Sequence, residues 1–156
     1  MKIFIASDHA AFNEKNALRD YLAKNYEVVD LGTNSTESTH YPEWAKKLVE
    51  NVIQDNVPGI LLCGSGIGVS MTANRFQGIR AALCHDVDDA KMSRLHNNAN
   101  VLCLAGRKTS VEDMKKMADT FLTTEFEGGR HEMRVKQFNE LGEAVYPKPS
   151  DDTGSK

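Results

Sequence analysis

A cysteine next to a glycine-rich loop is the clearest chemical feature of the sequence. Cys63 ends an apolar run that begins at Gly59, and Gly64, Gly66 and Gly68 follow it. A thiol can act as a base or a nucleophile once ionised. Glycines let backbone N–H groups approach an anion closely, and such groups at the start of a helix favour negative charge. A lone cysteine is more often a buried small hydrophobe, so the catalytic interpretation depends on what else reaches this loop.

The residues after Cys63 exclude the familiar phosphate-binding motifs. Val69 stands where a dinucleotide fingerprint needs its third glycine. A phosphate-hydrolysing cysteine loop needs an arginine at the same position. No Gly-Lys-Ser or Gly-Lys-Thr follows, which excludes a P-loop. The loop therefore favours a cradle for an anion or an enediolate.

Short apolar segments alternate with amphipathic ones, which is typical of a parallel α/β sheet. We predict strands at Lys2–Ala6, Glu27–Leu31, Gly59–Cys63, Ile79–Leu83 and Val101–Ala105. One helix is predicted from the apolar stripe Ala45, Leu48, Val49, Val52 and Ile53. A second helix has Val111, Met114, Ala118, Phe121 and Leu122 at the same spacing. A last helix is predicted to start after Gly128 and Gly129 and to bury Val135, Phe138 and Leu141.

Polar residues follow three of the predicted strands. Asp8 and His9 come after the first strand, Cys63 ends the third, and Arg107 comes after the fifth. Right-handed crossovers place the carboxyl ends of parallel strands at one edge of the sheet, where ligands bind in open α/β folds. We therefore expect these four side chains to share one site.

His96 and Asn97 end a helical segment predicted to begin near Val87. A lone histidine is usually structural, but one beside an amide, in a chain with a candidate thiol base, suggests acid–base chemistry. This helix starts at the carboxyl edge and runs away from it, over ~15 Å for about ten residues. If His96 and Cys63 act on one molecule, His96 must therefore come from a second subunit related by a two-fold axis.

Arg130 and Arg134 lie one helical turn apart near the start of the last predicted helix. Like charges at this spacing repel by about 0.2–0.5 kcal/mol, and cations are disfavoured at the positive end of a helix dipole. One interpretation is a solvated face relieved by Glu127 and Glu132. The other is a dianion bound between two guanidiniums, whose shape suits phosphate. The spacing alone leaves both open.

The composition is that of an ordinary soluble globular protein, with 156 residues and a net charge of −3. We expect one domain over residues 1–145 and a disordered tail over 146–156. The negative charge argues against a nucleic-acid or anionic-membrane surface, so an anionic substrate needs a local positive pocket. The three cysteines lack disulfide or zinc spacing, which fits a reducing cytoplasm and no bound metal. We expect no signal peptide and no membrane span.

Several short motifs are spread over about Lys2 to Leu141. They are Ser7-Asp8-His9-Ala10-Ala11, Asp30-Leu31-Gly32-Thr33, Tyr41-Pro42, Cys63 to Gly68, Gly78-Ile79-Arg80-Ala81, Arg94-Leu95-His96-Asn97 and Glu127-Gly128-Gly129-Arg130-His131. Together they resemble the type B ribose-5-phosphate isomerases. The resemblance implies a Rossmann-like three-layer α/β fold, with a five-stranded parallel sheet, helices on both faces and a C-terminal helix. It also implies a homodimer or tetramer with shared active sites, which interconverts ribose 5-phosphate and ribulose 5-phosphate without a metal or other cofactor.

The same resemblance implies a role for each candidate site residue. Cys63 would be the general base that moves a proton between C1 and C2 of the sugar. His96, helped by Asp8, would open the furanose ring. The enediolate oxygens would be held by Asn97 and by the loop residues Gly64, Ser65, Gly66, Ile67 and Gly68. The phosphate would be bound by His9, Arg107, Arg130 and Arg134, and the sugar pocket would be lined by Tyr41. Ser65 stands where relatives often carry threonine, so the hydroxyl is kept.

Two other functions stay open at this stage. An isomerase of the same family could act on galactose 6-phosphate or allose 6-phosphate. Galactose 6-phosphate isomerases use two different subunits that divide the site residues, whereas this chain carries the full set. A flavodoxin-like module that binds an anion or nucleotide without catalysis is the alternative from another class. Such a module would not need Cys63 and His96 together.

Overall fold

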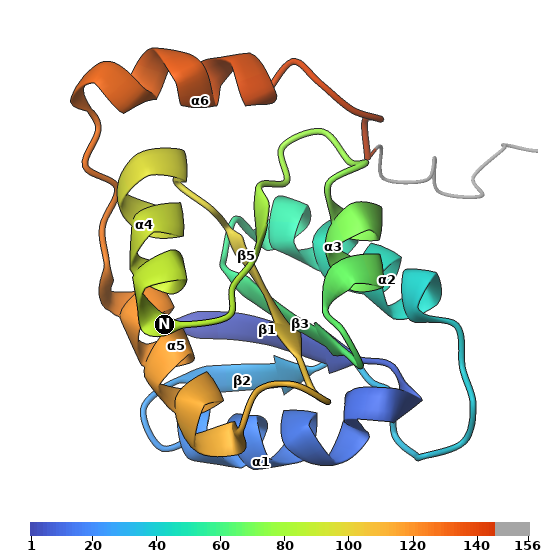
Figure 1. Cartoon of the computed structure of the whole chain (residues 1–156). Helices are drawn as coiled ribbons and strands as arrows, with labels where there is room; N and C mark the ends of the chain where they lie inside the picture. Colours follow the sequence, from blue (N-terminus) through green and yellow to red (C-terminus); the bar gives the residue numbers. More distant parts are fainter. Residues whose placement is uncertain (146–156) are drawn as a thin grey trace, which may run out of the picture.

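A five-stranded parallel sheet forms the centre of the fold, in the strand order β2-β1-β3-β5-β4 (Figure 1). The computed structural model describes residues 1–145, so the tail predicted at 146–156 lies outside the described residues. The strands are β1 (Lys2–Ser7), β2 (Glu27–Asp30), β3 (Gly59–Cys63), β4 (Ala81–Leu83) and β5 (Val101–Ala105). The helices are α1 (Phe12–Leu22), α2 (Tyr41–Asp55), α3 (Ile67–Ala73), α4 (Val87–Asn97), α5 (Val111–Thr123) and α6 (Glu132–Phe138), with the short 3₁₀ helices η1 (His9–Ala11) and η2 (Gly129–His131). In this part of the chain, every helix is too short or too polar to span a bilayer.

Alternating strand side chains build two hydrophobic cores, one on each face of the sheet. Ile60 and Leu62 of β3 pack with α1, α4 and α5 on one face. Leu61 and Cys63 pack with α2 and α3 on the other. Successive side chains of a strand point to opposite faces, so an unbroken apolar run is buried on both sides. The predicted three-layer α/β arrangement is therefore confirmed, and it directs Cys63 toward the layer of α2 and α3.

The strand β4 begins two residues later than the predicted range, at Ala81 instead of Ile79. The backbone N–H of Arg80 donates to Asn100 Oδ1 at 2.8 Å, and that of Ala81 donates to Asn74 Oδ1 at 2.8 Å. These side-chain amide oxygens accept hydrogen bonds from backbone N–H groups that a longer strand would donate to a neighbouring strand. The observed ranges of β3 and β5 equal the predicted ones.

The prediction that α6 buries three apolar residues is wrong for two of them. Val135 is buried, but Phe138 is 45% exposed and Leu141 is 66% exposed. The helix ends at Phe138, so the helical spacing that would place Leu141 on the buried side is lost. Figure 1 shows α6 away from the sheet, where the short helix meets little of the core.

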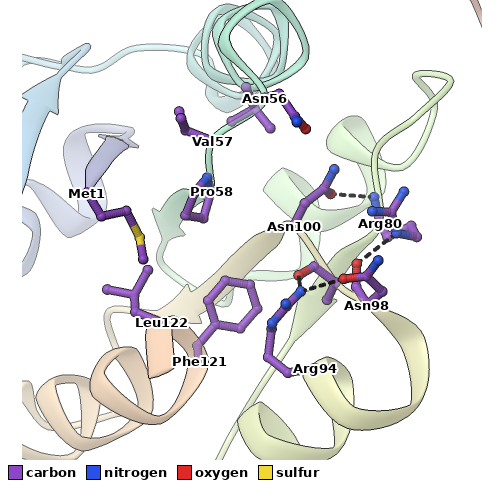
Figure 2. Close-up of a pocket in the computed structure, with 12 residues that line it drawn as sticks. Met1, Asn56, Val57, Pro58, Arg80, Arg94, Asn98, Asn100, Phe121 and Leu122 are labelled. Carbon is purple, nitrogen blue, oxygen red and sulfur yellow. Dashed lines mark hydrogen bonds between the residues drawn. The ribbon is translucent and has the colours of Figure 1, made fainter. Parts of the chain in front are cut away.

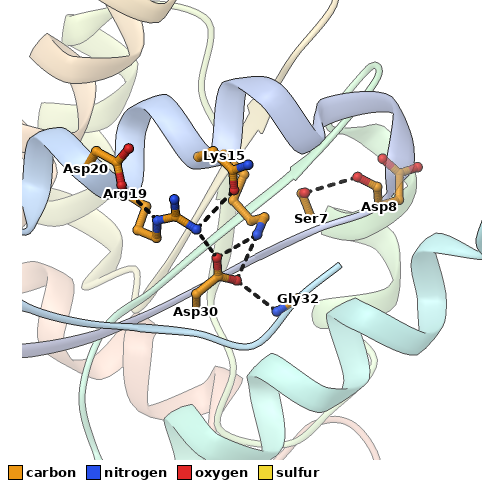
Figure 3. A network of polar contacts seen from close by, with 8 residues as sticks. Ser7, Asp8, Lys15, Arg19, Asp20, Asp30 and Gly32 are labelled. Carbon is orange, nitrogen blue, oxygen red and sulfur yellow. Dashed lines mark hydrogen bonds and ion pairs between the residues drawn. The ribbon is translucent and has the colours of Figure 1, made fainter. Parts of the chain in front are cut away.

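A buried ion pair ties α1 to the end of β2 (Figure 3). Lys15 Nζ lies 2.7 Å from Asp30 Oδ2, and the lysine side chain is 1% exposed. Arg19 Nη1 also donates to Asp30 Oδ2 at 2.8 Å, and the Gly32 N–H donates to Oδ1 at 2.9 Å. Burial alone would raise the pKa of Asp30, but these hydrogen bonds outweigh it and hold that pKa below its usual range.

We expect Asp30→Asn to lower the free energy of unfolding by about 3 kcal/mol at neutral pH, because it leaves the buried Lys15 charge without its carboxylate. Urea unfolding followed by circular dichroism measures this loss. Asp20→Asn is the matched control, because Asp20 pairs with Arg19 from a side chain that is 72% exposed. Its expected cost is below about 1 kcal/mol.

The pH dependence gives the ion-pair prediction a second test. The folded-state pKa of Asp30 is depressed, so its contribution is complete above the ordinary aspartate pKa of about 3.9 and is lost as the pH falls through the lowered value. The stability difference between wild type and Asp30→Asn should therefore be constant near neutrality and shrink in acid. A difference that is small at neutral pH would contradict the assigned role of the pair.

Candidate active site

A cleft of about 470 Å³ opens at the carboxyl edge of the sheet, and small-molecule sites are typically of this size. It is lined by Asp8, His9, Ala10, Tyr41, Cys63, Gly64, Ser65, Ile67, Gly68, Met71 and Arg107. The four side chains predicted to share this edge are therefore together. Ala10 and Met71 were missed, because neither residue type carries chemistry that a sequence pattern reveals.

Cys63 lies at the end of β3 with its thiol 3.2 Å from the backbone nitrogen of Gly66, which donates to Sγ. Gly66 has φ +74°, and a Cβ there would lie 2.5 Å from a methyl carbon of Leu83. Only glycine adopts this left-handed turn and fits this space without strain. The loop conformation that brings an N–H to the sulfur therefore depends on Gly66, and this donor stabilises a thiolate more than a thiol.

The other two cysteines are in different surroundings. Cys84 follows β4 and Cys103 lies within β5, and both are buried. Burial raises the pKa of the Cys84 thiol to about 12 and raises that of Cys103 well above its ordinary value. Both thiols therefore stay protonated at neutral pH and act as small apolar core residues.

Tyr41 begins α2 and covers one side of the glycine loop. Pro42 occupies the first turn of that helix, where its missing N–H leaves no hydrogen bond unmade. A Cβ at position 68 would lie 2.6 Å from the Tyr41 ring. Gly68 is therefore needed for the ring to pack against the start of α3, and this contact brings the phenol to the cleft.

Asp8 and His9 are held by backbone donors immediately after β1. The Ala10 N–H donates to Asp8 Oδ1 at 3.0 Å and caps the 3₁₀ helix η1. The Thr39 N–H donates to His9 Nδ1 at 3.0 Å. Because Nδ1 accepts this bond, the ring proton of neutral His9 is on Nε2, which can donate to an anion.

Arg107 supplies positive charge to the same cleft. Its backbone N–H donates to the Gly64 carbonyl at 3.0 Å, which fixes the turn after β5 against the loop after β3. Among residues 1–145, Arg107 forms no ion pair. A guanidinium without a carboxylate partner is available to bind a phosphate.

The remaining predicted site residues lie elsewhere, and three of them, His96, Arg130 and Arg134, gather around His131. His96, Asn97, Arg130 and Arg134 do not line the cleft of Cys63. The His96 ring stacks on that of His131, with ring centres 4.3 Å apart and planes 17° apart. Burial and the nearby charges of His96, Arg130 and Arg134 lower the pKa of His131. The structure thus divides the candidate residues into two groups within one chain.

His131 and Glu127 are part of this cluster and were not predicted as site residues. Glu127 Oε2 lies 3.7 Å from His96 Nε2. Ligand atoms of His96, Glu127 and His131 lie within 4.8 Å of one another, so these residues could hold a metal ion, which their sequence spacing does not reveal. The adjacent Arg130 and Arg134 oppose a cation there.

Comparisons with known proteins identify the family of this chain. The family model described as Ribose/Galactose Isomerase matches residues 3–138 of the chain. This chain belongs to the ribose/galactose isomerase family. A curated member, ribose-5-phosphate isomerase B of Escherichia coli, is 41% identical over 137 residues, which cover 86% of this chain and 92% of the relative.

Solved structures of this isomerase family have the same fold. A ribose 5-phosphate isomerase from Thermotoga maritima is 51% identical, with a TM-score of 0.87, and the match covers 90% of this chain and 98% of that one. Ribose-5-phosphate isomerase B from Mycoplasma genitalium, solved with bound ribulose-5-phosphate, is 40% identical with a TM-score of 0.85, and the match covers 89% and 94% of the two chains. The predicted Rossmann-like fold and the family resemblance are therefore confirmed.

Proposed function

We propose that this protein is an aldose–ketose isomerase that interconverts ribose 5-phosphate and ribulose 5-phosphate in the non-oxidative pentose phosphate pathway. The observation that carries the proposal is the cleft in which the Cys63 thiol faces the same space as Asp8, His9 and Arg107. Isomerising an aldose phosphate needs a base near the sugar carbons, donors for the developing enediolate and an anchor for the phosphate. The three free cysteines suit a reducing compartment, so we place the reaction in the cytoplasm.

Cys63 is the proposed base. After ring opening, its thiolate removes the proton from C2 of the open-chain aldose, and the electrons of that bond form the C1–C2 double bond of a cis-enediolate. The electrons of the C1=O π bond move to O1, and a proton then passes from O2 to O1. The same sulfur delivers its proton to C1 while the C2–O bond becomes the ketone carbonyl, which gives the ketose. The Gly66 N–H that donates to Sγ stabilises the thiolate between turnovers. We assign the enediolate oxygens to Asn97 and to the loop from Gly64 to Gly68, including Ser65 and Ile67.

Ring opening needs a proton on the ring oxygen and the loss of one from the C1 hydroxyl. We assign this exchange to His96, helped by Asp8. Asp8 is buried at the cleft, and its Oδ1 accepts the Ala10 N–H, which leaves further acceptor capacity on the carboxylate. Such a carboxylate can orient an incoming imidazole and stabilise its protonated form.

We propose that the enzyme is a homodimer, or a tetramer built from such dimers, in which each site takes Cys63 from one subunit and His96 from the other. The separation of the two residue groups supports this arrangement. Apolar side chains are also exposed beside each group: Ile67 and Met71 near the cleft, and Met133 and Phe138 on α6. A second copy that covers both surfaces would remove this apolar area from water.

The substrate assay decides between this function and its nearest alternative. Purified protein in excess EDTA is given ribose 5-phosphate, allose 6-phosphate or galactose 6-phosphate, and ketose formation is measured. We expect the highest kcat/KM for ribose 5-phosphate, and activity that survives the chelator because the proposed base is a thiol. Higher kcat/KM for a hexose phosphate would favour the hexose alternative, and loss of activity that a divalent ion restores would overturn the thiol-base scheme.

We expect Arg130→Ala and Arg134→Ala to weaken binding of substrate and of inorganic phosphate. Each removes one guanidinium from a pair that has no carboxylate partner within residues 1–145. Loss of a charge-assisted hydrogen bond costs about 1.5–3 kcal/mol. The measurement is the rise in melting temperature caused by phosphate, which should shrink in both variants. Arg75→Ala is the control, because Arg75 is another exposed arginine that forms no ion pair among residues 1–145. An unchanged phosphate effect in the Arg130 and Arg134 variants would refute the anchor.

A further inference from the structure

A second cavity lies at the amino edge of the sheet, opposite the active-site cleft. Its volume is about 290 Å³, and it shares no lining residue with the cleft. Pro58, Arg80 and Asn100 line it, and they directly precede β3, β4 and β5. Figure 2 shows Met1, Val57 and Leu122 on one side of this cavity and two arginines on the other.

Arg80 and Arg94 form the polar wall of this cavity (Figure 2). Arg80 Nε donates to the Asn98 carbonyl at 2.8 Å, and its Nη1 donates to Asn139 Oδ1 at 3.1 Å. Arg94 Nε donates to the Thr124 carbonyl at 3.0 Å, and its Nη1 donates to Asn98 Oδ1 at 3.0 Å. Neutral acceptors therefore hold both guanidiniums in place without cancelling their charge.

Neither guanidinium has a carboxylate partner among residues 1–145. Burial lowers the pKa of both arginines, and the charge of Arg94 lowers that of Arg80 further. Both stay charged at neutral pH, because guanidinium does not lose its proton in proteins. The site thus holds two cations that repel each other and that lack a counter-ion in the described part of the chain.

The Nη2 group of each arginine has no protein acceptor within the described residues. No fully buried side-chain nitrogen or oxygen in this part of the protein lacks a partner. Both Nη2 groups therefore reach solvent. Both arginines line this cavity, and Arg80 also lines a neighbouring pocket beside Phe76 and Phe138. Asn98 adds a donor, because its Oδ1 accepts from Arg94 and its amide nitrogen has no hydrogen-bond partner among residues 1–145.

We propose that this cavity is a second ligand site, which binds a small oxyanion, phosphate or carboxylate, carried by a partly apolar molecule. Two fixed guanidiniums with free Nη2 donors match the paired oxygens of such a group. Arg19 gives the contrast within the same chain, because both its Nε and its Nη1 already contact carboxylates. Phe121 and Leu122 would cover the apolar part of the ligand. The volume suits a small metabolite.

The test follows the side-chain Nε–H resonances of the arginines by NMR in the unmodified protein. Inorganic phosphate and acetate are titrated separately at constant ionic strength, and Arg80→Lys and Arg94→Lys assign the signals. We expect both signals to shift with one shared dissociation constant in at least one titration, while the Arg19 signal does not move. The anion that saturates at the lower concentration identifies the preferred head group.

The active site also has cations, so the measurement is repeated in Arg107→Ala. The response of Arg80 and Arg94 should persist in that variant, whether or not the proposed isomerase activity is correct. Arg80→Gln should weaken binding seen at Arg94 about tenfold, the loss expected for one charge-assisted hydrogen bond. The proposal would be overturned if the Nε–H chemical shifts of Arg80 and Arg94 do not change, or if they change without saturation in both titrations.

Discussion

Cys63→Ala is expected to lower kcat for ribose 5-phosphate isomerisation by at least ~10²–10⁴, the usual contribution of a general base. No other ionisable side chain among the cleft residues after β3 can replace the thiol, since Ser65, Ile67 and Met71 have no suitable group. The substitution removes only a sulfur from a site lined by the glycine loop, so phosphate should still bind. Initial rates of ketose formation measure the first effect, and calorimetric titration with phosphate measures the second.

The other cysteines provide matched controls for this experiment. Cys84→Ala and Cys103→Ala remove thiols of the same size from the core. We expect both variants to keep their turnover and to lose stability, as core truncations do. If Cys63→Ala keeps near wild-type turnover, or if the three variants lose activity equally, the thiol is not the base.

A mixture of two inactive variants, Cys63→Ala and His96→Ala, is expected to recover about a quarter of wild-type activity after joint unfolding and reassembly. Half of randomly formed dimers contain one copy of each variant, and one of the two sites in such a dimer is intact. The other site carries both substitutions. The expected recovery follows because the structure places His96 outside the cleft that holds Cys63 in the same chain.

The control for this mixture is each variant unfolded and reassembled alone, which should stay inactive. Mass spectrometry under native conditions shows whether mixed dimers have formed. A mixture that stays inactive although mixed dimers are present would mean that Cys63 and His96 act within one chain, and the proposal of shared sites would be withdrawn.

The sequence by itself determined the sheet and the part of the candidate site that lies at the carboxyl edge of the sheet. The continuous apolar runs of β3 and β5 are strand signals that do not depend on distant residues, and their predicted ranges match the structure. Parallel strands share a carboxyl edge whatever the details of packing, so Asp8, Cys63 and Arg107 could be placed together in advance.

Only the tertiary structure decided which residues far apart in the sequence meet. Lys15 is buried against Asp30, and nothing in the sequence around either residue indicates this contact. The sequence also did not reveal the stack of His96 on His131 or the cavity that Arg80 and Arg94 line. Strand and helix patterns are set by residues close together in the sequence. The contacts named here depend instead on how the helices pack on the sheet, and this packing is determined by residues throughout the core.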